Sequence, residues 1–176
     1  MTRVGVRRRA FLSAGISAVL AGSGIACRRK PSSGWRFFTD EEAETAAAIC
    51  EQIIPADRDP GARDAGVVNY IDVQLSRRFR RFRTIYRQGL ADVDTSSRAR
   101  FGNVFVRLTA DQQVQVLNEM EEKSKIFFDL ILSHTRQGYY GDPRHGGNRN
   151  MASWKMVGLP FPPVRGRQHY DDSKVG

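Results

Sequence analysis

The sequence predicts an all-α fold, with five or six helices in a single compact domain and a loop-rich C-terminal third. Apolar residues recur at three- and four-residue spacing, two Thr-led capping boxes precede such runs, and no segment alternates like a half-buried strand. The length of 176 residues suits one domain, and 40% hydrophobic residues suit a packed core. No apolar run is long enough for a dependable membrane span, which excludes a multi-span protein.

The first helix is predicted to begin at Thr39 and to end at Pro55. Thr39 and Glu42 form a capping box, in which the Thr39 hydroxyl accepts from the Glu42 amide and the Glu42 side chain reaches back. Because Cys50 lies on the apolar stripe of this helix, we expect it to be a buried small residue. The stripe consists of Ala46, Ile49, Cys50, Ile53 and Ile54.

A loop rich in Asp, Gly and Pro follows at 56–66, and the apolar residues of 67–75 predict a short buried helix. Another helix is predicted through the arginine stretch, residues 77–87, and onward to the polar run that begins at Thr95. Four side chains at helical spacing in this stretch are expected to face the core, with the arginines around them. They are Phe79, Phe82, Ile85 and Tyr86.

Two more helices are predicted in the second half of the chain. Thr109 and Gln112 form the second capping box, and the helix that follows has the apolar stripe Val114, Leu117 and Met120. Ser124 then begins a helix whose apolar residues run toward His134.

The net charge of +9 and the isoelectric point near 10.1 come from two segments. Residues 1–30 hold seven of the 28 basic residues and no acidic residue, and the arginine stretch holds six more. The remaining 15 basic residues are set against 19 acidic ones, so the rest of the chain is slightly acidic. We interpret the arginine stretch as a solvated face or a surface for an acidic protein partner, and expect no nucleic-acid partner.

Residues 1–26 have the order of an export signal: a basic stretch, a weakly apolar segment and small residues before Cys27. Arg8 and Arg9 are followed by Phe11 and Leu12, which resembles a twin-arginine signal and predicts export by the twin-arginine translocase. An ordinary export signal or an N-terminal anchor is the alternative. The chain is therefore expected to be periplasmic.

Residues 27–34 read as a polar linker, and two cleavage patterns fit its beginning. Gly24-Ile25-Ala26-Cys27 matches a lipoprotein site with Cys27 acylated, although Gly24 stands where Leu is preferred. Cleavage just before Cys27 by an ordinary signal peptidase fits equally well. Membrane association would then come from a lipid on Cys27 or from partners.

The chain has no Gly-x-Gly-x-x-Gly after a strand and no Cys-x-x-Cys-His, so neither a dinucleotide site nor an attached haem is predicted. His134, His145 and His169 lack the spacing of metal ligands. A His134–Asp142 acid/base pair can be drawn, but nothing supplies a nucleophile or pocket for it. We therefore expect no catalytic, cofactor-binding or metal-binding residue in this chain.

Residues 134–160, here called the C-terminal block, form the least ordinary part of the sequence. Its four central glycines are expected to allow positive φ, Asp142-Pro143 to start a turn, and the Asn148 amide to tie two parts of the loop. The aromatic side chains supply packing or partner anchors. The block contains His134, Thr135, Gly138, Tyr139, Tyr140, Gly141, Asp142, Pro143, Gly146, Gly147, Asn148, Trp154, Met156, Gly158 and Pro160.

These residues resemble the gluconate 2-dehydrogenase subunit 3 family, whose pattern is H-T-x-x-G-(aromatic)-(aromatic)-G-D-P-x-(aromatic)-G-G-N followed by W-x-M-x-G-x-P. His145 departs from the pattern at a usually aromatic position. The Ile53-Ile54-Pro55 run, the Gly61-Ala62-Arg63 loop and a turn over Asp72, Gln74 and Leu75 also fit. The resemblance defines a helical domain over 35–162, and the polar tail 163–176 departs from it.

The resemblance implies a non-catalytic small subunit of a membrane-associated dehydrogenase complex. The large subunit of such complexes carries FAD, belongs to the glucose-methanol-choline type, and oxidises a sugar, sugar acid or polyol. A third, cytochrome c subunit with haem c often receives the electrons. The small subunit is expected to carry no redox group and to assist assembly and twin-arginine co-export of the flavin subunit. A free-standing exported structural or binding lipoprotein is the alternative.

Overall fold

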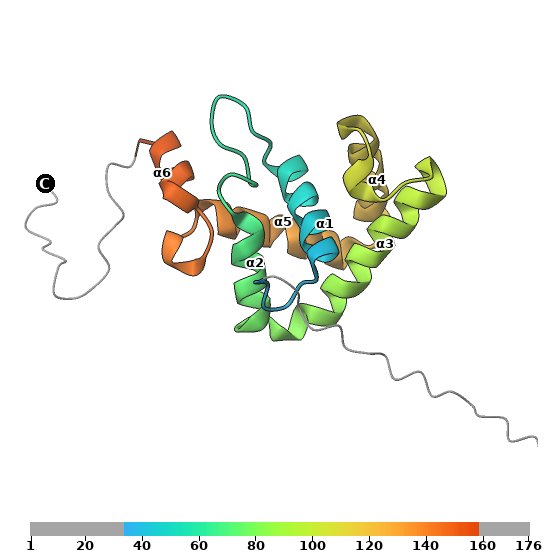
Figure 1. Cartoon of the computed structure of the whole chain (residues 1–176), viewed down its shortest axis with the longest axis horizontal. Helices are drawn as coiled ribbons and strands as arrows, with labels where there is room; N and C mark the ends of the chain where they lie inside the picture. Colours follow the sequence, from blue (N-terminus) through green and yellow to red (C-terminus); the bar gives the residue numbers. More distant parts are fainter. Residues whose placement is uncertain (1–33, 159–176) are drawn as a thin grey trace, which may run out of the picture.

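Six α-helices and four short 3₁₀ turns make up residues 34–158, the part of the chain described by the computed structural model (Figure 1). No strand occurs in this part, so the predicted all-α fold is confirmed. The predicted export signal, the linker with Cys27 and the tail 163–176 lie outside it, apart from Gly34. The helices are α1 (Asp40–Ile53), α2 (Val67–Ser76), α3 (Arg83–Phe101), α4 (Ala110–Lys123), α5 (Lys125–Tyr140) and α6 (Ala152–Met156).

Helix α5 organises the fold because every other α-helix packs against it. It passes behind α1 and α2 in Figure 1, with α6 at one end of the molecule and α4 at the other. Its buried side chains recur at helical spacing and include Phe127, Ile131 and Tyr139. The core is completed by fully buried side chains from the other helices and loops, among them Phe38, Ile49, Ile71, Tyr86 and Phe105.

The predicted helix starts and the burial of Cys50 are confirmed. Thr39 and Thr109 each accept from the amide three residues on, and Glu42 and Gln112 each accept from the amide of the capping threonine. The Cys50 side chain is buried in the core. Local side-chain chemistry was sufficient for these predictions, since each cap involves neighbours within one turn.

The prediction of one helix through the arginine stretch is wrong. Helix α2 ends at Ser76, a 3₁₀ turn η1 (Arg80–Phe82) follows, and α3 runs to Phe101 rather than ending near Thr95. The Phe79 amide donates to the Gln74 carbonyl, which turns the chain and brings the Phe79 ring onto α5. The Thr95 and Ser97 hydroxyls donate to carbonyls four residues back and leave α3 intact.

Two further details differ from the sequence prediction. Val114 is largely exposed, and the buried face of α4 contains Val116 and Gln113, whose amide donates to the Phe105 carbonyl. Helix α5 continues past His134 to Tyr140, so the first part of the C-terminal block is helical. None of the helices in residues 34–158 combines the length and the apolar composition that crossing a membrane requires.

Candidate functional site

The C-terminal block folds back on the end of α5 and satisfies its last carbonyl groups. Helix ends leave up to four carbonyls without partners, and here three successive carbonyls receive side-chain donors. Ser153 Oγ donates to the Tyr139 carbonyl at 2.6 Å, and Trp154 Nε1 donates to the Tyr140 carbonyl at 3.0 Å. Asn148 Nδ2 donates to the Gly141 carbonyl at 2.9 Å.

Asn148 is the centre of this arrangement. It is fully buried with a left-handed φ of 46°, and its Oδ1 accepts from the Ser153 amide while its Nδ2 binds Gly141. The predicted tie through the Asn148 amide is therefore confirmed. A second predicted feature, the turn at Asp142-Pro143, is also present as the 3₁₀ turn η3 (Pro143–His145).

The glycines of the block serve close packing more than positive φ. Among the four central ones, Gly146 has a positive φ, 101°, and the expectation is wrong for the other three. A Cβ on Gly147 would lie 2.2 Å from the Gly138 carbonyl oxygen, and one on Gly138 would lie 2.9 Å from the Tyr70 ring. A Cβ on Gly141 would lie 2.4 Å from the Gln137 carbonyl oxygen. Small size at these positions lets the block, α2 and α5 approach closely.

His134 and Asp142 do not pair with one another. The His134 ring is buried, its Nδ1 lies 2.8 Å from the Tyr86 hydroxyl, and it stacks on Phe79 at a centroid distance of 4.2 Å. Burial lowers the pKa of His134 to about 4. Asp142 instead binds Arg144, whose side chain and backbone lower the pKa of the carboxyl to about 2. The contacts that His134 and Asp142 each make therefore exclude an acid/base pair between them.

Thr135 and Cys50 form another buried contact, with the Thr135 hydroxyl 3.2 Å from Cys50 Sγ. Burial raises the pKa of the Cys50 thiol to about 12, so the thiol stays protonated at neutral pH. His134, Thr135 and Asn148 therefore act inside the fold, as packing and hydrogen-bonding groups.

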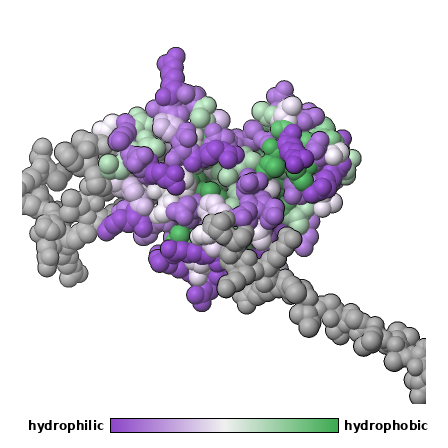
Figure 2. Space-filling view, viewed as in Figure 1, coloured by the Kyte–Doolittle hydropathy of each residue, from purple (hydrophilic) through white to green (hydrophobic). Residues whose placement is uncertain are grey.

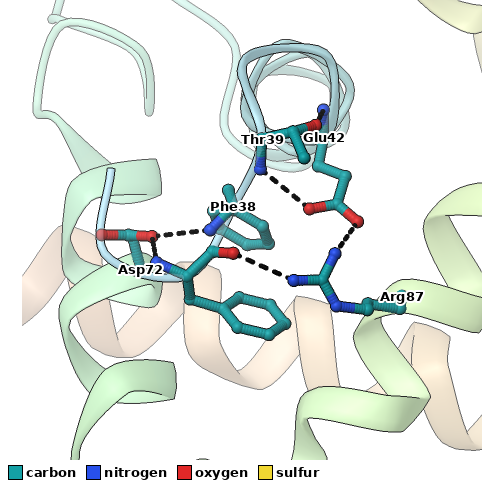
Figure 3. A network of polar contacts seen from close by, with 6 residues as sticks. Phe38, Thr39, Glu42, Asp72 and Arg87 are labelled. Atoms are coloured by element: carbon teal, nitrogen blue, oxygen red, sulfur yellow. Dashed lines mark hydrogen bonds and ion pairs between the residues drawn. The ribbon is translucent and has the colours of Figure 1, made fainter. Parts of the chain in front are cut away.

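An anchor for the N-terminal segment was missed by sequence reasoning. Asp72, buried on α2, accepts from the amides of Arg36, Phe37 and Phe38 at 2.8, 2.8 and 3.0 Å. Figure 3 shows the bond to Phe38 and the contacts of Arg87. Arg87 on α3 donates to the Glu42 carboxylate and to the Phe37 carbonyl. The expected turn over Asp72, Gln74 and Leu75 is part of α2. A lone acid within the apolar run 67–75 was the available signal.

Part of the block remains at the surface. Tyr140 and Val157 are more than half exposed, and Met156 is 38% exposed, next to the buried Trp154. Gly158 ends the described region with a φ of 73°. Hydrophilic residues cover most of the face in Figure 2, and hydrophobic ones gather toward the α4 end. Val114 on α4 and Ile126 at the start of α5 are exposed hydrophobic residues.

In residues 34–158, no three His, Cys, Asp or Glu side chains gather in a way that would hold a metal ion. The candidate site in this region is therefore a surface for contacts. It consists of a self-capped block, an anchored N-terminal segment and exposed aromatic and aliphatic groups.

Comparison with known sequences identifies the family. The profile of the family described as Gluconate 2-dehydrogenase subunit 3 matches residues 40–160, which include all six helices and the C-terminal block. No curated protein and no solved structure gives a match. Since the matched region covers well over half of the chain, this protein belongs to the gluconate 2-dehydrogenase subunit 3 family, whose members are subunits of multi-subunit dehydrogenase complexes.

Proposed function

We propose that this chain is the non-catalytic small subunit of an exported dehydrogenase, bound to a FAD-containing large subunit of the glucose-methanol-choline type. The complex would oxidise a sugar, sugar acid or polyol and pass electrons to a cytochrome c subunit. The observation that carries the proposal is the family match over 40–160, together with the paired arginines of the leader.

The packing of the C-terminal block supports a role in binding a partner. Three of its polar groups are used inside the fold, where Asn148, Ser153 and Trp154 bind the end of α5. The large hydrophobic side chains that the block leaves exposed are Tyr140, Met156 and Val157, and aromatic and Met side chains are typical anchors of protein interfaces. A rigid block with exposed apolar groups suits a subunit contact.

The leader supports a role in export. A receptor of the export machinery reads the twin-arginine signal. A folded flavin subunit that has no leader of its own could therefore cross the membrane bound to this chain. The assembled complex would then lie in the periplasm, held at the membrane by its partners or by a lipid on Cys27.

The test is a double substitution, Arg8→Lys/Arg9→Lys, in cells that also produce the proposed flavin subunit. We expect both proteins to stay in the cytoplasm, because the leader keeps its charge but loses the paired arginines. The matched control is Arg28→Lys/Arg29→Lys in the linker, which should leave export unchanged.

Export of the flavin subunit in the Arg8→Lys/Arg9→Lys cells would refute the carrier role. Purification of the processed chain without any flavoprotein would instead favour a free-standing exported lipoprotein.

A further inference from the structure

A pocket of about 380 Å³ opens between α2, the turn after it, α5 and η3. This volume lies within the usual range for ligand sites, roughly 300–1,000 Å³. The family motif and the arginine stretch meet here. The lining residues are Tyr70, Gln74, Arg78, Phe79, Arg81, Gln137 and His145.

Gln74 is the unusual member of this lining. Its residue is 6% exposed, yet its side-chain carboxamide makes no hydrogen bond with the part of the chain that the structure describes. Gln137, which also lines the pocket, is engaged through both its oxygen and its nitrogen, since it accepts from the Tyr70 hydroxyl at 3.1 Å and donates to Ser133 Oγ at 3.0 Å. The carboxamide atoms are not fully enclosed, because Ser96 Oγ is the only fully buried side-chain N or O atom without a partner in residues 34–158. Gln74 therefore offers a donor and an acceptor to whatever occupies the pocket.

The two arginines that line the pocket also lack ion-pair and hydrogen-bond partners within residues 34–158. Three neighbours outside it are engaged: Arg80 and Arg83 donate to the Ser76 and Leu75 carbonyls, and Arg87 pairs with Glu42. Arg78 and Arg81, by contrast, form neither an ion pair nor a hydrogen bond with residues 34–158, although Arg81 lies over the Phe82 ring.

Within residues 34–158, no acidic side chain lines the pocket. Asp142, three residues before His145, has its carboxylate bound to Arg144. Burial raises the pKa of Tyr70, and the Arg78 guanidinium close to it offsets part of that rise. Two exposed guanidinium groups thus line the same pocket as the Gln74 carboxamide and two aromatic rings.

We infer that this pocket receives an acidic segment of the partner subunit, with a carboxylate on Arg78 and Arg81 and a peptide group on Gln74. Guanidinium groups bind carboxylates through paired N–H donors. A carboxamide matches a peptide group with one donor and one acceptor. The identity of the occupant as a partner subunit rests on the proposed function, whereas the chemistry of the pocket does not.

The first experiment measures binding of the full chain to the co-produced flavin subunit. Arg78→Glu/Arg81→Glu is compared with Arg77→Glu/Arg80→Glu, which makes the same charge change on neighbouring exposed residues outside the lining. We expect at least tenfold weaker binding for the pocket pair and less than threefold for the control pair. Equal losses would overturn the inference, because they would indicate a general basic surface.

Gln74→Leu separates binding from folding. Since the Gln74 carboxamide faces the pocket and has no hydrogen-bond partner within residues 34–158, we expect the melting temperature of the variant to be unchanged or higher while partner binding falls at least fivefold. A lower melting temperature with unchanged binding would show that the carboxamide serves the fold and would overturn its assigned role.

The second experiment needs no partner. The processed chain is titrated with acetyl-Glu-Glu-amide and with acetyl-Gln-Gln-amide while the Gln74 side-chain amide signals are followed by NMR. NMR shifts that appear with the acidic peptide alone and are lost in Arg78→Glu/Arg81→Glu would support the site. They would do so even if the flavin subunit does not bind, because failed binding of the flavin subunit would refute the proposed function and not the pocket. No shift with either peptide would overturn the inference. Binding to phosphatidylglycerol vesicles tests a membrane surface instead. Equal loss of vesicle binding in Arg78→Glu/Arg81→Glu and Arg77→Glu/Arg80→Glu, without an NMR shift on adding either peptide, would overturn the inference and assign the arginines to a membrane surface.

Discussion

Asp72 holds together two parts of the chain that are more than 30 residues apart. Its carboxylate accepts from three consecutive amides that precede α1. Hydrogen bonds to an ionised acceptor are worth more than neutral ones, about 1.5–3 kcal/mol each in net terms. A single side chain thus fixes how the N-terminal segment lies on α2.

We predict that Asp72→Asn lowers the free energy of unfolding by about 2 kcal/mol or more, because the amide NH₂ would face backbone donors. Urea denaturation followed by circular dichroism measures this. Asp129→Asn is the control: Asp129 is half exposed and pairs with Lys125, so the change should stay within about 0.5 kcal/mol. Equal effects of the two substitutions would contradict the anchoring role.

His134 makes stability depend on pH. Burial lowers its pKa to about 4 in the folded chain, against about 6.5 when unfolded. The unfolded state therefore binds the proton first, and stability falls as pH drops from about 6.5 to about 4, by up to ~3 kcal/mol. Above pH 6.5 the residue contributes no such dependence.

The measurement is urea denaturation of the wild type and His134→Gln at several pH values across this window. We expect the variant to be less stable at pH 7 but to have a flatter pH profile. His145→Gln, at an exposed position, should keep the wild-type slope. Parallel profiles for wild type and His134→Gln would rule out His134 as the group responsible.

At this scale, the sequence allowed some residue roles to be predicted and not others. The burial of Cys50 followed from its place on an apolar stripe, and the Asn148 tie followed from a short loop. The partners of Asp72 and His134 lie 34 to 48 residues away, and no local spacing specifies them. The unpaired carboxamide of Gln74 likewise has no signature in the sequence.

The helices show a similar division between their beginnings and their ends. Capping boxes at Thr39 and Thr109 specify two starts through contacts within one turn. Ends depend on what the helix packs against. Helix α3 passes through polar residues to Gly102, and α5 extends to Tyr140 because the folded-back block binds its last carbonyls.

Close approach of the block to α5 predicts a strong effect of Gly147→Ala. The added Cβ would meet the Gly138 carbonyl oxygen at 2.2 Å, and backbone cannot move aside as a side chain can. We expect a loss of about 2 kcal/mol or more in unfolding free energy, measured by urea denaturation followed by circular dichroism.

Gly102→Ala is the matched control. Gly102 has a positive φ of 72° but no atom near an added Cβ, so the cost should be about 1 kcal/mol from backbone strain alone. A smaller loss for Gly147→Ala than for Gly102→Ala would show that the block is not pressed against α5.

For the whole molecule, the folded unit begins before the region shared with the family. The family match starts at residue 40, but Phe37 and Phe38 are buried against the core and bound to Asp72. Phe to Ala changes in cores cost about 3–5 kcal/mol, so losing both rings removes much of the stability of a domain this size.

We predict that a chain beginning at Gly34 folds cooperatively, whereas one beginning at Thr39 loses more than about 4 kcal/mol or fails to fold. Thermal unfolding by circular dichroism compares them. A third chain, beginning at Trp35 with Phe37→Leu and Phe38→Leu, keeps the backbone bonds to Asp72 and should have intermediate stability. Identical melting temperatures for the Gly34 and Thr39 chains would contradict this boundary.

The anchored segment also determines where mechanical tension would act. A subunit tethered through the chain ahead of residue 34 would transmit a pull to the three amides on Asp72 and to the carbonyl held by Arg87. These bonds connect to α2 and α3, in the body of the bundle. Tension on the leader or on a lipid would therefore be borne by α2 and α3 together before it could unwind the first turn of α1.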